Sequence, residues 1–544
     1  MLPVDETVPH DHALTPLEAF LRGVHRQLGA DAVAPDEAVR RASANVEGAG
    51  HRFAAVVRPR QVQEVQAVLR LATATGQPVR PWSRGCNWGY GTRTPVDARC
   101  VGLDLSALDA IRRMDETSGV VEIEPGVTQG QLADWLEAQG SAFYLDVTGS
   151  SRGTSVLGNA LDRGIAYSSA RAECIRHLEV VLADGRVLRT GMASWSTDIA
   201  DRYRHGLGPD LTGLFVQSNL GVVTGCSMVL RRRPPCRLTL RAHLKDPRRL
   251  PAFIQAIGDL KRDLGLDSIV HVADGARAST TLAPLARQHA HAAGLDLTRD
   301  QAEALVRSII GTGWAALGVI EGERSMVRAA SREARRRLRP FGRLALLDRR
   351  RLGQLAGLAE RVGANKRLAV ARAAIEMSGL TAGVPTDGAL HGIYWDHRDD
   401  EPSWRQPEHG QTGWLMINPL LPTEPRAIEQ VLACLEAEAE RAGCKLAVTL
   451  NVIGPQLVLA VASLTWPLAD RAAGERALEA QRRLTAQLFE EGLVPYRVGT
   501  AEHPHIPWDE VHAGVLQALG RALDPAAVIA PGRYAPARVR GAQP

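Results

Sequence analysis

Three features of the sequence predict an α+β fold in more than one domain. The 544 residues are too many for a single hydrophobic core. Up to about residue 236, short strand-like runs and amphipathic helices alternate, with turns rich in glycine and proline. Beyond that residue, longer amphipathic helices alternate with strands, which is typical of an antiparallel sheet covered by helices.

The first part of the chain contains short elements that follow one another closely. Val62, Val65 and Val68 recur at helical spacing, and we expect helices over residues 16–29, 62–75 and 128–139. The strands expected here span residues 53–57, 79–82, 101–105 and 120–123. A hairpin is expected to join residues 178–182 to 187–189 across the turn Ala183-Asp184-Gly185.

The second part of the chain has longer helices, expected over residues 251–264, 299–310, 325–339 and 426–442. The strands expected between them span residues 315–321, 414–418, 446–452 and 458–463, and a last helix spans 508–523. Arginine clusters at 335–337 and 349–351 fall on predicted helices, where a solvated face is the expected role.

Composition excludes several classes of function. The chain is 45% hydrophobic and 23% charged, as in ordinary soluble proteins, and its net charge of +5 is too small to indicate a nucleic-acid-binding protein. That surplus suits an anionic cofactor or substrate. Seven cysteines without a CxxC pair argue against a metal, an iron–sulfur cluster, a c-type haem or a disulfide framework. Met1 to Pro16 lacks a signal-peptide pattern and no apolar run reaches membrane-spanning length, so we expect a cytoplasmic protein.

The clearest motif is the glycine-rich loop Arg84-Gly-Cys-Asn-Trp-Gly-Tyr-Gly91, which follows a predicted strand. Three glycines allow positive φ angles, so backbone N–H groups can surround an anion such as a pyrophosphate. The loop is not G-x-G-x-x-G and does not lead directly into a helix, so a classical dinucleotide fold is not indicated. Taken alone, the loop also fits an ordinary turn.

Four further segments, in order, extend this pattern: Val121-Glu-Ile-Glu-Pro-Gly-Val-Thr128, Ser155-Val-Leu-Gly-Asn-Ala-Leu-Asp-Arg-Gly164, Leu182-Ala-Asp-Gly-Arg-Val-Leu-Arg-Thr-Gly191 and Leu214-Phe-Val-Gln-Ser-Asn-Leu-Gly-Val-Val-Thr224. Together with the C-terminal Leu523-Asp-Pro-Ala-Ala-Val-Ile-Ala-Pro-Gly-Arg533, they resemble the vanillyl-alcohol oxidase and p-cresol methylhydroxylase flavoprotein family, in its 4-phenol-oxidising branch. The resemblance covers about residues 53–232.

The resemblance implies a two-subdomain FAD-binding domain of the p-cresol methylhydroxylase (PCMH) type with a substrate, or cap, domain. We predict an N-terminal helical extension (1–48), the FAD-binding domain (49–236), the cap (237–499) and a C-terminal segment that returns to the FAD-binding domain (500–544).

The resemblance also implies which residues meet an FAD that lies extended between the subdomains. The pyrophosphate set is Arg84, Gly85, Cys86, Asn87, Trp88, Gly89 and Gly91, in which Cys86 is expected to contribute backbone rather than a covalent link. The adenosine set is Pro125, Gly126, Val127, Gly221, Val223 and Thr224. The ribityl and isoalloxazine set is Ser155, Gly158, Asn159, Arg163 and Tyr167, and Arg533 joins from the returning C-terminal segment.

Three residues match the phenol-binding positions of the family: Tyr90 in the glycine-rich loop, and Tyr496 with Arg497 near the C-terminus. One cation and two hydroxyl donors stabilise a phenolate, which makes hydride loss from the para carbon easier. The resemblance therefore implies an oxidase or dehydrogenase that removes hydride from a benzylic or allylic carbon of a para-substituted phenol and forms a quinone methide. Taken singly, each residue also fits a structural role.

The chain departs from the family at two places. The catalytic aspartate of the family falls on Ser150 or Ser151, which are weaker acid–base groups, while Asp146 matches an earlier structural aspartate. The strand at residues 413–419 offers neither the histidine nor the tyrosine that tethers the flavin, and His391 and His397 come too early and are expected at the surface. We therefore expect non-covalent FAD.

The missing carboxylate leaves two alternatives open: oxidation of a non-phenolic alcohol or hydroxy acid, and a flavin-binding partner subunit with little turnover. In each enzymatic case the electrons pass to O2 or to an external acceptor, because the chain has no haem motif. A homodimer is expected by analogy only, and neither nucleic acid nor a membrane is an expected partner.

Overall fold

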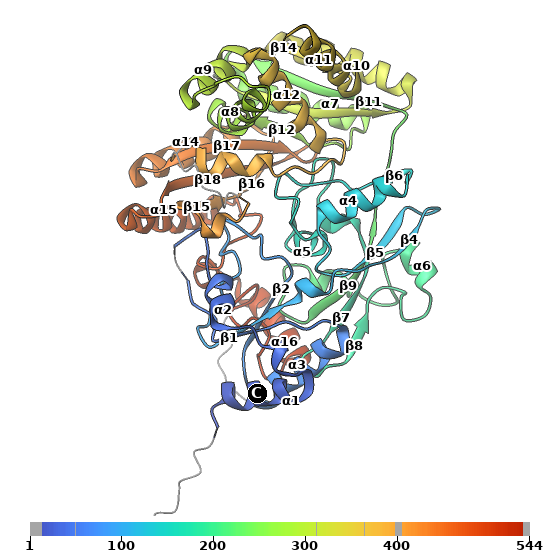
Figure 1. Cartoon of the computed structure of the whole chain (residues 1–544), viewed down its shortest axis with the longest axis vertical. Coiled ribbons are helices and arrows are strands. Elements are labelled where there is room, and N and C mark those ends of the chain that lie inside the picture. The colour runs from blue at the N-terminus through green and yellow to red at the C-terminus, as the bar shows by residue number, and fades with distance from the viewer. Residues whose placement is uncertain are drawn as a thin grey trace, which may run out of the picture.

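The computed structural model describes residues 14–48, 50–311, 313–363, 365–395, 397 and 405–536, which form two stacked lobes (Figure 1). One lobe holds a three-stranded and a five-stranded sheet, and the other, which we call the cap lobe, is built on an eight-stranded sheet. The predicted α+β class is confirmed. The domain boundaries themselves remain predictions, and most of the stretch from Met1 to Pro16 lies outside the described residues.

The three-stranded sheet is parallel, with β3 (Val101–Asp104) between β1 (Ala55–Val57) and β2 (Val79–Trp82). The helices α1 (Pro16–Leu28) and α3 (Val62–Thr75) share its apolar core. The C-terminal segment adds to the same sheet, because Ile529 pairs with Val79 in a parallel bridge.

The five-stranded sheet is antiparallel, in the order β4 (Ile111–Asp115), β5 (Val120–Ile123), β9 (Val222–Val229), β7 (Ile175–Val181) and β8 (Val187–Arg189). The helices α4 (Gln129–Ala138) and α5 (Val156–Leu161) pack on its apolar face. A short ribbon, β6 (Phe143–Tyr144) with β10 (Arg231–Arg232), leads from this sheet toward the cap lobe.

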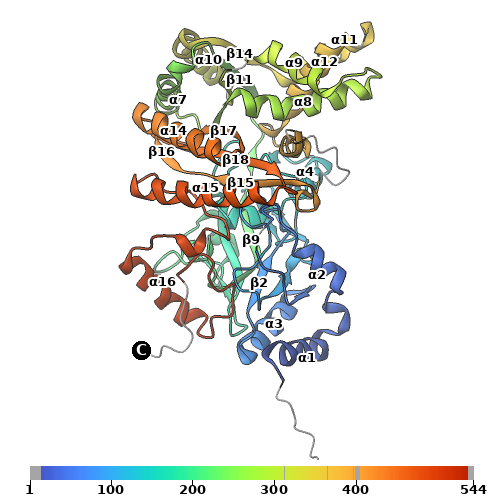
Figure 2. The same ribbon diagram turned by 90° about the vertical axis from the view of Figure 1, so that its left-hand side faces the viewer.

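The cap sheet is antiparallel, and along it the strands lie in the order β14 (Gly342–Leu347), β11 (Cys236–Leu244), β13 (Ala315–Gly322), β12 (Val270–Ala273), β17 (Lys445–Val452), β18 (Leu457–Pro467) and β15 (Thr412–Ile417). β16 (Leu420–Pro422) also pairs with β18. The helices α7 (Leu250–Leu264), α10 (Arg324–Leu338), α14 (Pro425–Ala442) and α15 (Arg471–Glu490) cover one face and share its core (Figure 2).

The opposite face of the cap sheet is turned toward the N-terminal lobe. Two helices, α8 (Gly275–Ala292) and α12 (Lys366–Leu380), contribute to the same apolar core as the five-stranded sheet, so the two lobes share buried surface. The other helices are α2 (Asp36–Ala42), α6 (Thr197–Arg202), α9 (Arg299–Ile310), α11 (Arg349–Val362), α13 (His391–Trp395) and α16 (Glu510–Leu523). No helix within the described ranges is long and apolar enough to cross a membrane.

The segment that follows the cap returns to the N-terminal lobe and is held there by buried polar contacts. The Thr500 N–H donates to the Tyr90 carbonyl at 3.1 Å. The Glu502 carboxylate accepts from the Thr485 hydroxyl at 2.6 Å and from the Gly499 N–H at 2.7 Å. Burial raises the pKa of Glu502 to about 7, so this carboxyl opposes folding when it ionises.

We predict that Glu502→Gln makes the protein less sensitive to rising pH. The amide can accept from Gly499 and donate to Thr485, so it keeps both contacts without a charge. Because the folded-state pKa is raised from 4.5 to about 7, the wild type has the full stability below pH 4.5 and loses it as the pH rises through 7. A shift of this size corresponds to about 3 kcal/mol.

The measurement is the midpoint of thermal unfolding at pH 5 and pH 8. Glu475→Gln, an exposed residue on the helix that carries Thr485, is the matched control. The drop between the two pH values is expected to shrink in Glu502→Gln and to stay as in the wild type in the control. An equal drop in all three proteins would contradict the assignment.

Candidate active site

A cavity of about 1760 Å³ lies between the lobes, lined by the glycine-rich loop, α5, the cap sheet and the C-terminal segment. Ordinary small-molecule sites measure roughly 300–1,000 Å³. The cavity therefore has room for an extended dinucleotide together with a substrate.

The glycine-rich loop adopts the backbone that its sequence predicts. Gly85, Gly89 and Gly91 have φ angles of 69°, 79° and 93°. Close packing also requires glycine here: a Cβ on Gly89 would lie 2.4 Å from Met416 Cγ, and one on Gly91 would lie 2.2 Å from Thr500 Oγ1. The loop is therefore held between the cap sheet and the C-terminal segment.

Most of the predicted cofactor residues line the cavity: Arg84, Gly85, Cys86, Asn87, Trp88, Pro125, Ser155, Gly158, Asn159, Tyr167, Gly221, Val223 and Arg533. The others do not line it: Gly89, Gly91, Gly126, Val127, Arg163 and Thr224. Gly126 instead supports the loop, since its carbonyl accepts from Arg84 Nε at 2.6 Å.

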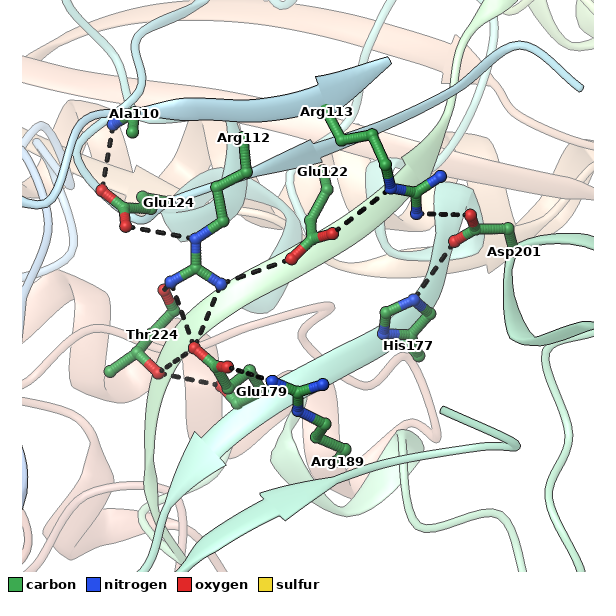
Figure 3. Close-up of polar contacts among 10 residues, drawn as sticks. All are labelled: Ala110, Arg112, Arg113, Glu122, Glu124, His177, Glu179, Arg189, Asp201 and Thr224. Carbon is green, nitrogen blue, oxygen red and sulfur yellow. Dashed lines mark hydrogen bonds and ion pairs between the residues drawn. The ribbon is translucent and has the colours of Figure 1, made fainter. Parts of the chain in front are cut away.

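Thr224 belongs to a charged network on the five-stranded sheet rather than to the cavity lining (Figure 3). Its hydroxyl donates to Glu179 Oε1 at 3.1 Å. Arg112 of β4 also contacts Glu122 of β5 and Glu179 of β7, and it donates to the Thr224 carbonyl of β9 at 3.2 Å, so this one side chain links four strands of the sheet. It also pairs with Glu124, which follows β5. The structure thus gives the Thr224 side chain a role in the scaffold.

The residues that line the cavity fit an anionic dinucleotide. Asn159 Oδ1 and Gln217 Nε2 are buried in its wall and have no protein partner among the described residues. Arg80, on the strand before the glycine-rich loop, is a buried residue of the cavity wall that the sequence analysis did not select. Burial lowers the pKa of Arg80 to about 10, and the nearby charge of Arg533 lowers it further. Buried cations and unsatisfied polar groups are what a diphosphate and a flavin ring require.

Two features concern whether a flavin would be attached covalently: the Cys86 thiol, and the strand at which the family tethers its flavin. Burial raises the pKa of Cys86 to about 12, so the thiol stays neutral and unreactive. Trp414 and Met416 of β15 line the cavity, and non-covalent attachment remains our prediction. His391 begins the short helix α13 and His397 lies just beyond it, and both histidines, which we expected at the surface, are half-buried.

The three predicted phenol-binding residues come together at one end of the cavity. The Arg497 guanidinium carbon lies 3.7 Å from the centre of the Tyr90 ring. Asn418, which follows β15, donates to the Tyr90 hydroxyl oxygen, and its carbonyl accepts the Tyr496 N–H at 2.7 Å. The Tyr496 hydroxyl has no partner among the described residues. Burial raises the pKa values of both tyrosines, so they remain hydroxyl donors.

A single carboxylate, that of Asp162 at the end of α5, orients Arg497. Arg497 contacts Asp162 Oδ2 at 3.3 Å, the Tyr534 hydroxyl donates to Oδ1 at 2.7 Å, and Arg533 lies 3.9 Å from Oδ2. Burial acts to raise the pKa of Asp162, but Arg497 and Arg533 hold it below its usual value. Asp162 is therefore ionised, and its single negative charge is smaller than the summed positive charge of the arginines around it.

The two serine candidates have different surroundings. Ser150 lines the cavity, and its hydroxyl bonds those of Thr148 and Thr154, each at 2.8 Å. Ser151 does not line the cavity, since its hydroxyl donates to Asp387 Oδ1 of the cap lobe at 2.9 Å. Of the pair, the structure therefore places only Ser150 where it can contact a ligand.

His271 on β12 is a cavity residue that the sequence analysis missed. Its Nδ1 lies 2.7 Å from Asn451 Oδ1, and its Nε2 is buried without a partner among the described residues. The ring lies 4.4 Å from that of Tyr167, whose hydroxyl reaches the loop that carries Ser150. Burial lowers the pKa of His271 to about 4. The alternating run from Val270 to Ala273 indicates a strand, but not what the histidine faces.

Comparisons with known proteins identify an FAD-binding domain in this chain. Residues 53–191 match the family model of an FAD binding domain. The chain is 31% identical to the 1'-carboxy-chondrochloren decarboxylase of Chondromyces crocatus over 95% of its length and 97% of that protein. It is 30% identical to the 4-cresol dehydrogenase [hydroxylating] flavoprotein subunit of Pseudomonas putida, over 42% of the chain and 44% of that subunit.

Solved structures show the same fold. p-Cresol methylhydroxylase aligns with a TM-score of 0.82 at 21% identity, covering 96% of this chain and 97% of that one. The 4-ethylphenol oxidase from Gulosibacter chungangensis aligns with a TM-score of 0.84 at 21% identity, covering 98% and 100%. Fold and site thus define an FAD-dependent oxidoreductase. The chain belongs to the vanillyl-alcohol oxidase and p-cresol methylhydroxylase family of flavoproteins.

Proposed function

We propose that this enzyme oxidises para-substituted phenols at the benzylic carbon. The observation that carries the proposal is the convergence of Tyr90, Tyr496 and Arg497 on one end of the cavity. Bound FAD supplies a two-electron acceptor. An oxidase that uses O2 and a dehydrogenase that uses an external acceptor are both compatible with these residues, and the cytoplasmic location and the homodimer remain predictions.

Arg497 and the two tyrosines bind the substrate oxygen and favour its ionised form. A charge-assisted contact to a guanidinium and hydrogen bonds from hydroxyl donors are strong in a buried site. The phenolate releases electron density to the para position, so that a hydride can leave the benzylic carbon. The substrate, having lost one proton and one hydride, is then a quinone methide, which takes up water or loses a further proton.

His271 is the proton acceptor that we propose in place of the missing aspartate. Its Nδ1–H is held by Asn451, so the lone pair of Nε2 is directed into the cavity. Because its pKa is lowered to about 4, the ring is neutral at pH 7 and able to accept a proton from water or from the para substituent. The hydroxyls of Thr148, Ser150 and Thr154, which line the same cavity, form a hydrogen-bonded chain that can pass a proton on.

A second candidate is oxidation coupled to loss of CO2, favoured by the relative that aligns over almost the whole chain and is named a decarboxylase. Both candidate reactions pass through a quinone methide. A quinone methide that carries a carboxylate on the carbon next to the exocyclic one can release CO2, and the electron pair of the broken bond restores the phenolate as a vinylphenol.

The test is anaerobic mixing of the yellow holoprotein with 4-ethylphenol, with its methyl ether and with 2-hydroxy acids. We expect the phenol to bleach the flavin band and the ether, which cannot ionise, to leave it unchanged. Arg497→Ala is expected to slow bleaching by about a hundredfold or more, because the phenolate loses its cation. Bleaching by hydroxy acids alone, or by phenol and ether at equal rates, would remove the phenol from the proposal.

His271→Gln is expected to slow the decay of the quinone methide to product, the step that follows bleaching of the flavin, by about a hundredfold and to abolish the acid limb of that step. In the wild type the rate should fall as the pH drops through about 4, where Nε2 becomes protonated and can no longer accept. His243→Gln, a second histidine on the cavity wall, is the matched control. Wild-type rates and an unchanged pH profile in His271→Gln would show that another group takes the proton.

A further inference from the structure

The face of the cap sheet that lines the cavity carries a row of side chains in register. From β14 across to β18 the row reads Ala345, Arg241, Leu317, His271, Asn451 and Leu459, and all six line the cavity. The intervening positions of β11, such as Leu240 and Leu244, point into the core on the other side. The alternation of the strand thus aims Arg241 at the cavity.

Arg241 is a half-buried cation of the cavity wall. Among the described residues no carboxylate or carbonyl oxygen makes an ion pair or hydrogen bond with its guanidinium, and its neighbours across the strands are Leu317 and Ala345. Burial lowers its pKa, with no nearby anion to offset the effect. An arginine remains protonated in proteins, so this charge lies in the cavity wall.

Arg237, on the same face of the same strand, shows the usual arrangement. Its partner across β13 is Glu321, and the two side chains form an ion pair at 2.7 Å. Four residues further along, at Arg241, the corresponding position of β13 is Leu317. The strand therefore neutralises one arginine with a carboxylate and leaves the other facing an open cavity.

The position of Arg241 relates it to the proposed chemistry. Strands in a sheet are spaced by about 4.8 Å, so the backbone of Arg241 lies about 10 Å beyond that of His271 and about 24 Å from Asn418 at the phenol-binding end. A para substituent that extends from the phenol-binding end along this row would therefore reach His271 before Arg241.

We propose that Arg241 binds a carboxylate carried by the para substituent of the substrate. The inference rests on the proposed function, since it takes the phenol to be held by Arg497 and the two tyrosines. The planar guanidinium offers two parallel N–H donors to a carboxylate. Lys245 and Arg343 are exposed residues of the cavity lining close in sequence or register to Arg241, and Asp246 is paired with Arg248, so this part of the lining attracts anions.

The experiment measures binding without turnover. The probes are 4-hydroxyphenoxy acetate, propanoate and butanoate, each with its methyl ester; they have oxygen where the benzylic carbon stands and cannot lose hydride. Dissociation constants are read from the shift of the flavin absorption band in the holoprotein. We expect at least one acid to bind about tenfold or more tightly than its ester.

Arg241→Gln is expected to remove that preference while the flavin content is unchanged, and Arg241→Lys to retain part of it. Arg328→Gln, which makes the same change of charge at an exposed position of α10 outside the cavity lining, is expected to change the acid affinity by no more than about twofold at physiological salt. Equal binding of acids and esters by the wild type, or equal effects of the Arg241→Gln and Arg328→Gln variants, would overturn the assignment.

The result also separates this inference from the proposed function. If 4-ethylphenol bleaches the flavin but acids gain nothing from Arg241, the phenol chemistry stands and the carboxylate site is lost. If acids bind through Arg241 while no phenol bleaches the flavin, the carboxylate site stands and the proposed reaction is lost.

Discussion

The structure depends on the shared carboxylate of Asp162. Three arginines from distant parts of the chain lie around it: Arg80 before the glycine-rich loop, Arg497 after the cap and Arg533 in the returning segment. One carboxylate cannot neutralise three buried cations, so the cluster keeps an excess of positive charge. That excess is costly in the protein alone and favourable once anions bind. Phosphates and a phenolate are anions of the kind that this part of the cavity can accept.

The cap sheet places the residues that a substrate would contact in order along one line. Asn418 ties the end of β15 to Tyr90 and Tyr496, so the phenol-binding residues are positioned by the sheet as well as by the loop. Across the same sheet the register places His271 and then Arg241 at increasing distance. Antiparallel pairing thus sets the order in which a long substrate would meet a cation, a base and a second cation.

Local patterns predicted much of this fold. The helix over Val62–Thr75 has the bounds expected from its apolar spacing. The glycine-rich loop has the positive φ angles that its glycines predict, at Gly85, Gly89 and Gly91. Contacts between residues that lie far apart in the chain could not be predicted from the sequence. Thr224 lies in a motif that resembles the family's, yet its hydroxyl donates to Glu179. His271 and Arg241 reach the cavity wall only because their strands pair with strands far away in the sequence. The helix α8 was not predicted, and Pro284 inside it obscures the helical pattern.

The central claim is that the buried arginines around Asp162 hold a substrate phenol in its ionised form. The direct measurement is the absorption spectrum of 4-nitrophenol, which has no benzylic hydrogen, bound to the holoprotein about two pH units below its free pKa. The account predicts the spectrum of the bound phenolate at that pH, because Arg497 favours the anion. A bound spectrum of the neutral phenol would contradict it.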